Sequence, residues 1–222
     1  MTIEARKIRL LMQLRRAGIT DTAVLSAMES IPRELFTPPA FQDQAYELMA
    51  LPIGRGQTLS APDVVAMMTQ ALECKGRETV LEIGTGSGYQ AAILSRVCRR
   101  VYTIERHRPL LEEAEERFKQ LRLHNITTYC GDGSKGWPEP RSFPRIIVTC
   151  AAVFPPEPLL EQLPEDGIMV LPVGGQGRTQ DLVKLRKTAS GVEQESLAAV
   201  RFVPLVAGEA NGEGSGEGRE SG

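Results

Sequence analysis

The sequence predicts an α/β fold: a doubly wound, mostly parallel sheet that ends in an antiparallel strand pair and follows a helical N-terminal extension. Three observations lead to this prediction. From residue 79, short segments rich in β-branched residues alternate with helical patterns, which is typical of a parallel sheet covered by helices. A glycine-rich turn joins the first of these segments to the helix after it. Beyond residue 173 the helical patterns stop, and two extended stretches follow each other directly.

The N-terminal extension begins with a predicted helix over residues 4–16, because its apolar side chains recur on one helical face. Gly18 ends this helix, and Thr20-Asp21 offers the start of a second helix, which Ile31-Pro32 closes. A third helical pattern begins near Pro62. We expect residues 1–60 to form a helical extension that ends in a loop, and residues 61–207 to form the main domain.

The main domain contains the alternating pattern. Strands are predicted at residues 79–83, 101–105, 126–130, 145–150 and 168–173, where β-branched residues are frequent and turn signals flank each segment. Helices are predicted between them at residues 89–97, 110–121 and 156–163. The antiparallel pair is expected at residues 181–188 and 197–206, with Ser190-Gly191 as the turn.

Composition limits the classes of protein to consider. The 222 residues are 41% apolar, which is enough for one domain with a substantial core. The formal net charge of −2 gives no basic field for non-specific nucleic-acid binding. No apolar run approaches the ~20 residues of a membrane span, and the N-terminus mixes charges among its apolar positions, unlike a signal peptide. We expect a cytoplasmic monomer that binds neither nucleic acid nor membranes.

Cysteine spacing and the C-terminal tail add two expectations. The four cysteines show no C-x-x-C pair and no neighbouring histidine pair, so we expect reduced thiols, mostly in the core, and no metal site. Residues 208–222 contain six Gly and four Glu and no large apolar side chain, which predicts a disordered tail.

The glycine-rich turn is the strongest candidate for a ligand site. In VLEIGTGSGY, residues 80–89, three glycines stand between the first strand and its helix, at Gly84, Gly86 and Gly88. The pattern lacks the last glycine of G-x-G-x-x-G, because Tyr89 follows Gly88, and this disfavours a pyrophosphate clamp. By itself the turn is compatible with a dinucleotide, a nucleoside or no ligand.

Three acidic residues make the prediction more specific. Glu82 lies in the first strand, Glu105 ends the second strand, and Asp132 follows the third. The carboxyl ends of parallel strands share one edge of a sheet, and a carboxylate at the second strand end can accept hydrogen bonds from both ribose hydroxyls. Any one of the three could be a solvated strand end, but together they suit a cationic nucleoside without phosphate. S-adenosylmethionine is such a ligand.

Several stretches resemble one family. They are IPRELF (31–36), ALPIGRGQTLSAP (50–62), VLEIGTGSGY (80–89), GDG (131–133), RIIVTCAA (145–152), LLEQLPEDGIMVLPVG (159–174) and VRFVPLV (200–206). The chain resembles the protein-L-isoaspartate O-methyltransferases of the bacterial type, within the Rossmann-like class I S-adenosylmethionine-dependent methyltransferases. It departs from the family pattern at residues 143–145 and 150–154, and at Ala61, where the family more often has Gln.

This resemblance implies an activity and roles for residues. The activity is methyl transfer from S-adenosylmethionine to the free α-carboxylate of L-isoaspartyl residues in damaged proteins and peptides, which starts repair through a succinimide. Ser60 would be the catalytic residue, and no metal is implied. Cofactor binding is expected at Glu82, Gly84, Thr85, Gly86, Ser87, Gly88, Glu105, Arg106, Asp132 and Gly133. Substrate binding is expected at Ile53, Gly56, Gln57, Thr58, Leu59, Ser60 and Cys150.

The role of Ser60 has two interpretations. Its hydroxyl could orient the substrate carboxylate, or it could only cap the helix that begins near Pro62. The local pattern favours the cap, whereas the resemblance favours catalysis. A carboxylate is already an anion at neutral pH and needs no strong base, and His107 and His124 fall at helix ends away from the serine motif.

Other functions remain open on the residues alone. A nucleic-acid methyltransferase would be expected to carry an Asn/Asp-Pro-Pro-aromatic turn or a Pro-Cys nucleophile after the fourth strand, where this chain has Thr149-Cys150-Ala151-Ala152. A small-molecule methyltransferase is a further alternative. A non-enzymatic module with a degenerate cofactor site is the third, although the intact glycines and acids argue against it.

Overall fold

The computed structural model describes residues 2–175 and 177–210. Its elements follow the predicted alternation. The helices are α1 (Ile3–Arg16), α2 (Thr22–Ser30), α3 (Pro62–Ala71), α4 (Tyr89–Val97), α5 (Arg108–Gln120) and α6 (Glu157–Gln162), with 3₁₀ turns η1 (Arg33–Phe36), η2 (Pro39–Gln44) and η3 (Gly133–Lys135). The strands are β1 (Leu51–Gly54), β2 (Gln57–Leu59), β3 (Thr79–Ile83), β4 (Arg100–Glu105), β5 (Ile126–Cys130), β6 (Arg145–Val148), β7 (Ile168–Val173), β8 (Gln180–Thr188) and β9 (Gly191–Val200).

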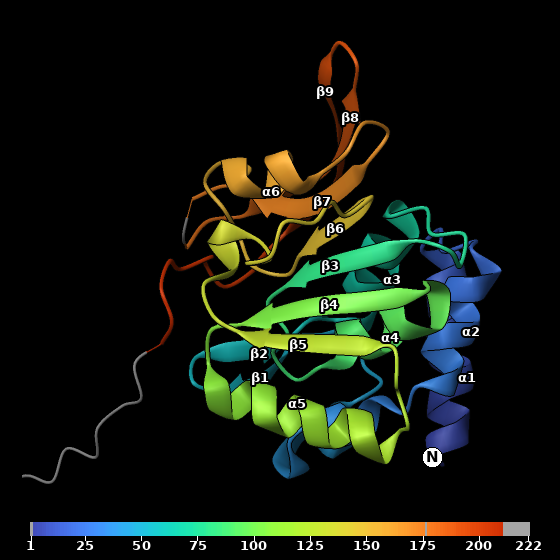
Figure 1. Cartoon of the computed structure of the whole chain (residues 1–222). Helices are drawn as coiled ribbons and strands as arrows, with labels where there is room; N and C mark the ends of the chain where they lie inside the picture. Colours follow the sequence, from blue (N-terminus) through green and yellow to red (C-terminus); the bar gives the residue numbers. More distant parts are fainter. Residues whose placement is uncertain (1, 176, 211–222) are drawn as a thin grey trace, which may run out of the picture.

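The central sheet has seven strands in the order β5-β4-β3-β6-β7-β8-β9 (Figure 1). The strands from β5 to β7 are parallel, and β8 and β9 add an antiparallel pair at one edge. The chain order reverses between β3 and β6, and in open α/β sheets such a switch point forms a crevice at the carboxyl ends of the strands. The predicted mostly parallel fold is therefore confirmed.

Two predicted strands differ from the observed bounds by more than one residue. The strand predicted at residues 145–150 ends at Val148, because Thr149 leaves the ladder to bond the end of β3. The strand predicted at residues 197–206 is instead β9, which ends at Val200. The hairpin of β8 and β9 projects beyond the other strands (Figure 1), and most of β9 is exposed, so its residues lack the apolar alternation that predicts a strand.

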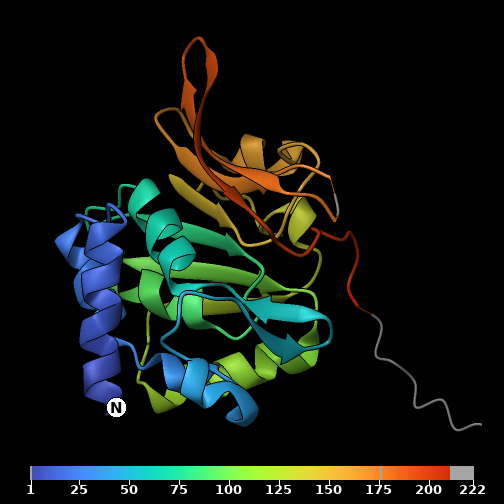
Figure 2. The same cartoon turned by 180° about the vertical axis from the view of Figure 1, so that it is seen from behind.

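Both faces of the sheet are covered. Alternate side chains of each central strand enter two separate cores, as the period of a strand requires. Val80, Val101 and Ile147 pack with α1 to α5 in one core, whereas Leu81, Ile104 and Ile146 pack with α6 and Trp137 in the other. Figure 2 shows the blue N-terminal helices and the cyan β1–β2 hairpin on the near side of the sheet.

The N-terminal helices form where the sequence predicts them. Thr2 caps α1, and the Asp21 carboxylate caps α2 by accepting from the amides of Ala23 and Val24. Leu10 and Leu14 of α1 enter the first core, together with residues of the sheet. The division between residues 60 and 61 stays a prediction, since this core contains side chains from both sides of it.

A crossing segment, residues 201–210, follows β9 and runs over the carboxyl edge of the sheet. The amide of Ala151 donates to the carbonyl of Val203, and the amide of Leu205 donates to the carbonyl of Ala151. Further along, Arg106 holds the segment through a bond from its Nε to the carbonyl of Gly208 (3.1 Å). The predicted disordered tail thus begins with three residues in contact with the domain, and its remaining part, residues 211–222, lies outside the described residues.

Among residues 2–175 and 177–210, no helix is both long enough and apolar enough to cross a membrane.

Candidate active site

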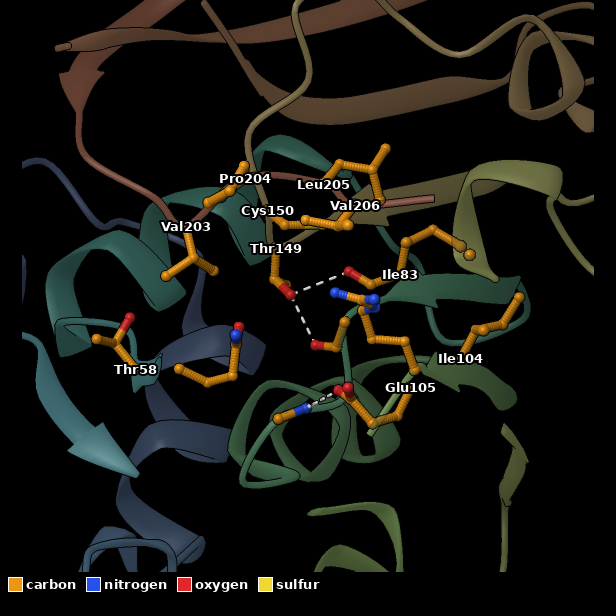
Figure 3. A pocket seen from close by; sticks show the side chains of 15 residues that line it. Thr58, Ile83, Ile104, Glu105, Thr149, Cys150, Val203, Pro204, Leu205 and Val206 are labelled. Atoms are coloured by element: carbon orange, nitrogen blue, oxygen red, sulfur yellow. Dashed lines mark hydrogen bonds between the residues drawn. The ribbon is translucent and has the colours of Figure 1, made fainter. Parts of the chain in front are cut away.

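The glycine turn between β3 and α4 depends on glycine for its shape. Gly84 and Gly88 have φ angles of 95° and 90°, which side-chain-bearing residues rarely adopt. A Cβ atom on Gly84 would lie 2.5 Å from the hydroxyl oxygen of Thr149. That hydroxyl donates to the carbonyl oxygens of Ile83 (3.0 Å) and Gly84 (2.6 Å), so it ties the turn to the end of β6 (Figure 3).

Glu105, the last residue of β4, holds the other side of the turn. Its Oε2 accepts from the amide of Gly86 (2.8 Å), and its Oε1 accepts from the amide of His107 (2.9 Å). Each carboxylate oxygen has a second lone pair for a ligand hydroxyl. The carboxylate therefore faces the cavity in a fixed orientation, as a ribose ligand requires (Figure 3).

A cavity opens between the glycine turn and the crossing segment. Glycines and polar groups form one side of it, and apolar side chains form the opposite wall. Its lining residues are Gln57, Thr58, Ile83, Gly84, Gly86, Ile104, Glu105, Arg106, Gly133, Thr149, Cys150, Val203, Pro204, Leu205 and Val206. Figure 3 shows Val203 to Val206 on the side of the cavity that faces away from Glu105. An apolar wall opposite a carboxylate suits a nucleoside with a flat base and a hydroxylated sugar.

A second, smaller cavity adjoins the first and contains the serine motif. It is lined by Thr58, Leu59, Ser60, Val65, Gly84, Thr85, Gly86, Ser87, Gln90 and Thr149. Thr58, Gly84, Gly86 and Thr149 line both cavities, so a group bound beside Ser60 would lie next to a ligand of the glycine turn.

The structure excludes one of the two interpretations of Ser60. Helix α3 begins after Ala61, and no side chain forms a capping hydrogen bond at its N-terminus. Ser60 is not a helix cap, and the cap interpretation that the local pattern favoured is wrong. Its half-buried side chain is available to the second cavity instead.

Glu82 lies elsewhere than predicted. Its carboxyl group is fully buried beneath the glycine turn and lines neither cavity. Thr103 donates to Glu82, and the hydroxyls of Thr103 and Thr85 lie 2.6 Å apart. Burial, and secondarily the Glu105 charge, raise the pKa of Glu82 to about 8. Glu82 thus supports the turn from below and has no contact with the cavity.

The other predicted residues divide into two groups. Within the two cavities lie Gly84, Thr85, Gly86, Ser87, Glu105, Arg106, Gly133, Gln57, Thr58, Leu59, Ser60 and Cys150. Ile53 lies against the turn, 3.4 Å from where a Cβ of Gly86 would stand. Asp132 lines a neighbouring cavity and binds the amide and hydroxyl of Ser134. Gly56 lies in the β1–β2 turn and Gly88 directly precedes α4, and neither lines the two cavities.

Sequence reasoning missed several lining residues. Thr149, Gln90, Ile83, Ile104 and residues 203–206 line the cavities without having been singled out. Thr149 belongs to RIIVTCAA, a stretch that carried the family resemblance, so that signal could have identified it. The apolar residues give no local signal, because only the fold brings them to the cavity.

The geometry of the described residues does not indicate a cysteine nucleophile or a metal site. Burial, with the Glu105 charge as the second cause, raises the pKa of the Cys150 thiol to about 12, so it is a thiol at neutral pH and no nucleophile. All four cysteines are free, and Cys98 and Cys150 are buried. Within the part of the chain that the structure describes, no three His, Cys, Asp or Glu side chains gather as a metal site requires.

Comparisons with known proteins agree with this geometry. The family model described as protein-L-isoaspartate(D-aspartate) O-methyltransferase matches residues 5–210. The chain belongs to this family. It is 62% identical over 207 residues to the protein-L-isoaspartate O-methyltransferase of Rhodospirillum centenum, with 93% of this chain and 94% of the relative covered. The enzyme of that name from Paramagnetospirillum magneticum is 60% identical over 206 residues, covering 92% and 96%.

Solved structures show the same fold. A protein-L-isoaspartate O-methyltransferase matches with a TM-score of 0.80 and 28% identity, over 90% of this chain and 66% of its own. A structure described as a putative enzyme of this family from Plasmodium falciparum, in complex with S-adenosyl-L-homocysteine, has a TM-score of 0.76 at 24% identity, over 89% of this chain and 97% of its own. The resemblance identified from the sequence is confirmed.

Proposed function

We propose that this site transfers a methyl group from S-adenosylmethionine to the free α-carboxylate of L-isoaspartyl residues in damaged proteins and peptides. The observation that supports this most directly is the match to the isoaspartate methyltransferase family over residues 5–210, which includes both cavities. The geometry adds that the serine motif and the glycine turn line adjoining cavities.

The residues present fit the cofactor. The Glu105 carboxylate suits the ribose hydroxyls, the glycine turn leaves room for close approach, and Asp132-Gly133 is the segment that the resemblance assigns to the adenine side. Ile83, Ile104 and Leu205 supply apolar surface for a flat base. When bound, S-adenosylmethionine supplies a methyl group on a positively charged sulfonium, which a carboxylate oxygen can accept.

The substrate carboxylate must be oriented towards the methyl group, but it needs no base to remove a proton. An isoaspartyl residue continues the backbone through its side-chain carbonyl, so its α-carboxylate is free and ionised at neutral pH. We assign the Ser60 hydroxyl the role of donating a hydrogen bond to one carboxylate oxygen, which directs the other towards the first cavity. The protonated Cys150 thiol does not compete as a nucleophile.

Water exclusion is the second contribution of the chain. Val203, Pro204 and Leu205 cover the cavity, and backbone bonds to Ala151 hold them in place. Removing water from a carboxylate strengthens its interaction with positioned donors and prevents side reactions. The methyl ester would then lose methanol as the next backbone amide attacks it, forming a succinimide that hydrolyses partly to normal aspartate.

Isoaspartyl-containing proteins and peptides are the expected partners. We also propose that the enzyme works as a monomer in the cytoplasm and on no nucleic-acid substrate. Four free cysteines suit a reducing compartment, and the net charge of −2 disfavours a nucleic-acid substrate.

The decisive experiment compares two peptides that differ only in one Asp or isoAsp residue. With labelled S-adenosylmethionine, we expect base-labile methyl ester on the isoAsp peptide and little on its Asp twin, since only the isoAsp peptide has the free α-carboxylate. Equal labelling of both peptides would contradict the proposed substrate. Label on RNA, DNA or a small carboxylic acid, with none on the isoAsp peptide, would point to another methyltransferase class.

A further inference from the structure

Arg33 is a fully buried cation that neither cavity explains. It belongs to η1 within the stretch IPRELF, and none of its surface is exposed. Its Nε donates to the carbonyl of Ala45 (2.7 Å), and its Nη2 donates to the carbonyl of Ser60 (2.7 Å). Its guanidinium also stacks over the ring of Tyr89, 4.7 Å from the centroid.

The burial of this charge is incompletely compensated. Among the residues that the structure describes, no carboxylate lies within salt-bridge distance of Arg33, and its Nη1 has no hydrogen-bond partner. Burial accordingly lowers the pKa of Arg33. Taking an unpaired charge out of water costs free energy, and the hydrogen bonds to the carbonyls of Ala45 and Ser60 are the contacts that offset this cost.

Arg33 joins Ser60, which lines the second cavity, to Tyr89, whose neighbours along the chain line the same cavity. Ser60 connects β2 to α3, whereas Tyr89 is the first residue of α4, directly after Gly88 of the glycine turn. Phe36 fixes the Tyr89 ring from another side, in an edge contact with ring centroids 5.4 Å apart. The guanidinium is therefore a rigid link between the serine motif and the start of the cofactor helix.

The bond to the Ser60 carbonyl has a consequence for the Ser60 hydroxyl. The carbonyl of a residue turns with its ψ angle, so a bond that holds the Ser60 carbonyl also restrains the Cα–Cβ bond from which the hydroxyl extends. On its other side, Ala61 is fixed by the helix, because its carbonyl accepts from the amide of Val65 (3.0 Å). In the link between β2 and α3, Ala61 is therefore held by the helix and Ser60 is held by Arg33.

We propose that Arg33 is a positioning residue for methyl transfer. By binding the Ser60 carbonyl and stacking on Tyr89, it holds the backbone from which the Ser60 hydroxyl extends at a fixed place relative to the glycine turn. The inference rests on the proposed function, since it requires that Ser60 orients the substrate carboxylate. Arg33 itself touches neither cavity, so its effect on turnover must pass through Ser60.

A double-mutant cycle tests this dependence. The variants are Arg33→Met, which keeps the apolar stem and removes all donors, Arg33→Lys, which keeps the charge, and each of them combined with Ser60→Ala. Turnover of an isoAsp peptide is measured per cofactor-binding site, counted by calorimetry with S-adenosylhomocysteine, so that unfolded molecules do not contribute. Arg33→Met should lower kcat at least tenfold with less than a threefold change in cofactor Kd, and Arg33→Lys should recover part of the loss. In the Ser60→Ala background, Arg33→Met should lower kcat by less than twofold.

Arg145 provides a matched control. It also donates to a backbone carbonyl, that of Pro144 (2.8 Å), and its buried Nε has no partner. It lies at the amino end of β6, opposite the carboxyl edge where the cavities open. Arg145→Met should lower the melting temperature and leave kcat per site unchanged.

Three results would overturn the inference. One is an unchanged kcat per site in Arg33→Met; another is an equal loss whether or not the Ser60→Ala change is also present. If Arg33→Met does not fold and binds no cofactor, Arg33→Lys replaces it in the cycle. The inference then fails if Arg33→Lys lowers kcat equally with and without the Ser60→Ala change. The third is a wild-type enzyme that labels no isoAsp peptide, and this result would refute the proposed function as well. If the wild-type enzyme is active but the kcat losses of Arg33→Met and Ser60→Ala are additive, only the role of Arg33 is refuted.

Discussion

Replacing Glu105 by alanine should weaken cofactor binding at least tenfold. The carboxylate is almost fully buried and is held by the amides of Gly86 and His107. In the complex it would also accept from ribose hydroxyls, and a hydrogen bond to a charged group contributes about 1.5–3 kcal/mol. Since about 1.4 kcal/mol corresponds to a factor of ten in Kd, the loss of one such bond alone predicts about a tenfold to 150-fold change.

Calorimetric titration with S-adenosylmethionine and with S-adenosylhomocysteine measures this effect. Glu105→Gln serves as the control, because it keeps an acceptor oxygen and the side-chain shape but loses the charge. If the charge strengthens the ribose contact, the glutamine variant should fall between the wild type and the alanine variant. An unchanged Kd in a folded Glu105→Ala protein would refute the reasoning and place the ribose elsewhere in the cavity.

Two further predictions concern Ser60 and Glu82. Ser60→Ala should lower kcat on the order of tenfold to a thousandfold, with cofactor affinity and melting temperature unchanged, because the hydroxyl caps no helix; full turnover would remove Ser60 from the site. For Glu82, the pKa rises from 4.5 to about 8 on folding, so its stabilising contribution is complete below pH 4.5 and is lost as the pH rises towards 8. Glu82→Gln mimics the neutral acid, and urea unfolding should show that it loses less stability than the wild type across this interval; parallel curves would contradict the assignment.

The parallel core of the sheet could be predicted because its signals are local. Strands β6 and β7 are short segments rich in branched apolar residues, and burial on both faces makes them almost continuously apolar. The glycine turn could also be predicted locally, because its glycines directly follow the first strand of the sheet and Glu105 ends the second. Thr85 and Ser87 line the second cavity, and their binding of the cofactor stays a prediction.

What the sequence did not reveal depends on long-range contacts. Nothing in the local pattern around Arg33 distinguishes it from an exposed arginine, because its partners Ala45, Ser60 and Tyr89 are distant in the chain. The position of Glu82 in the first strand predicts a cofactor-binding carboxylate, yet packing of the sheet buries it. The sequence alone does not distinguish an acidic residue that faces a ligand at the end of a strand from one that is buried beneath the turn.

The crossing segment also makes the active site a late product of folding. Its contact between Ala151 and Val203 and its bond from Arg106 to Gly208 join residues far apart along the chain. Contacts of this kind close large loops, and such loops form slowly and after local structure. The glycine turn can assemble from neighbouring strands and helices, but the apolar wall belongs to a segment that follows β9, so we expect it to assemble after β7, β8 and β9 have paired. Methyl transfer would therefore appear only after the last edge of the sheet has formed, and recovery of activity during refolding would lag behind recovery of helix content.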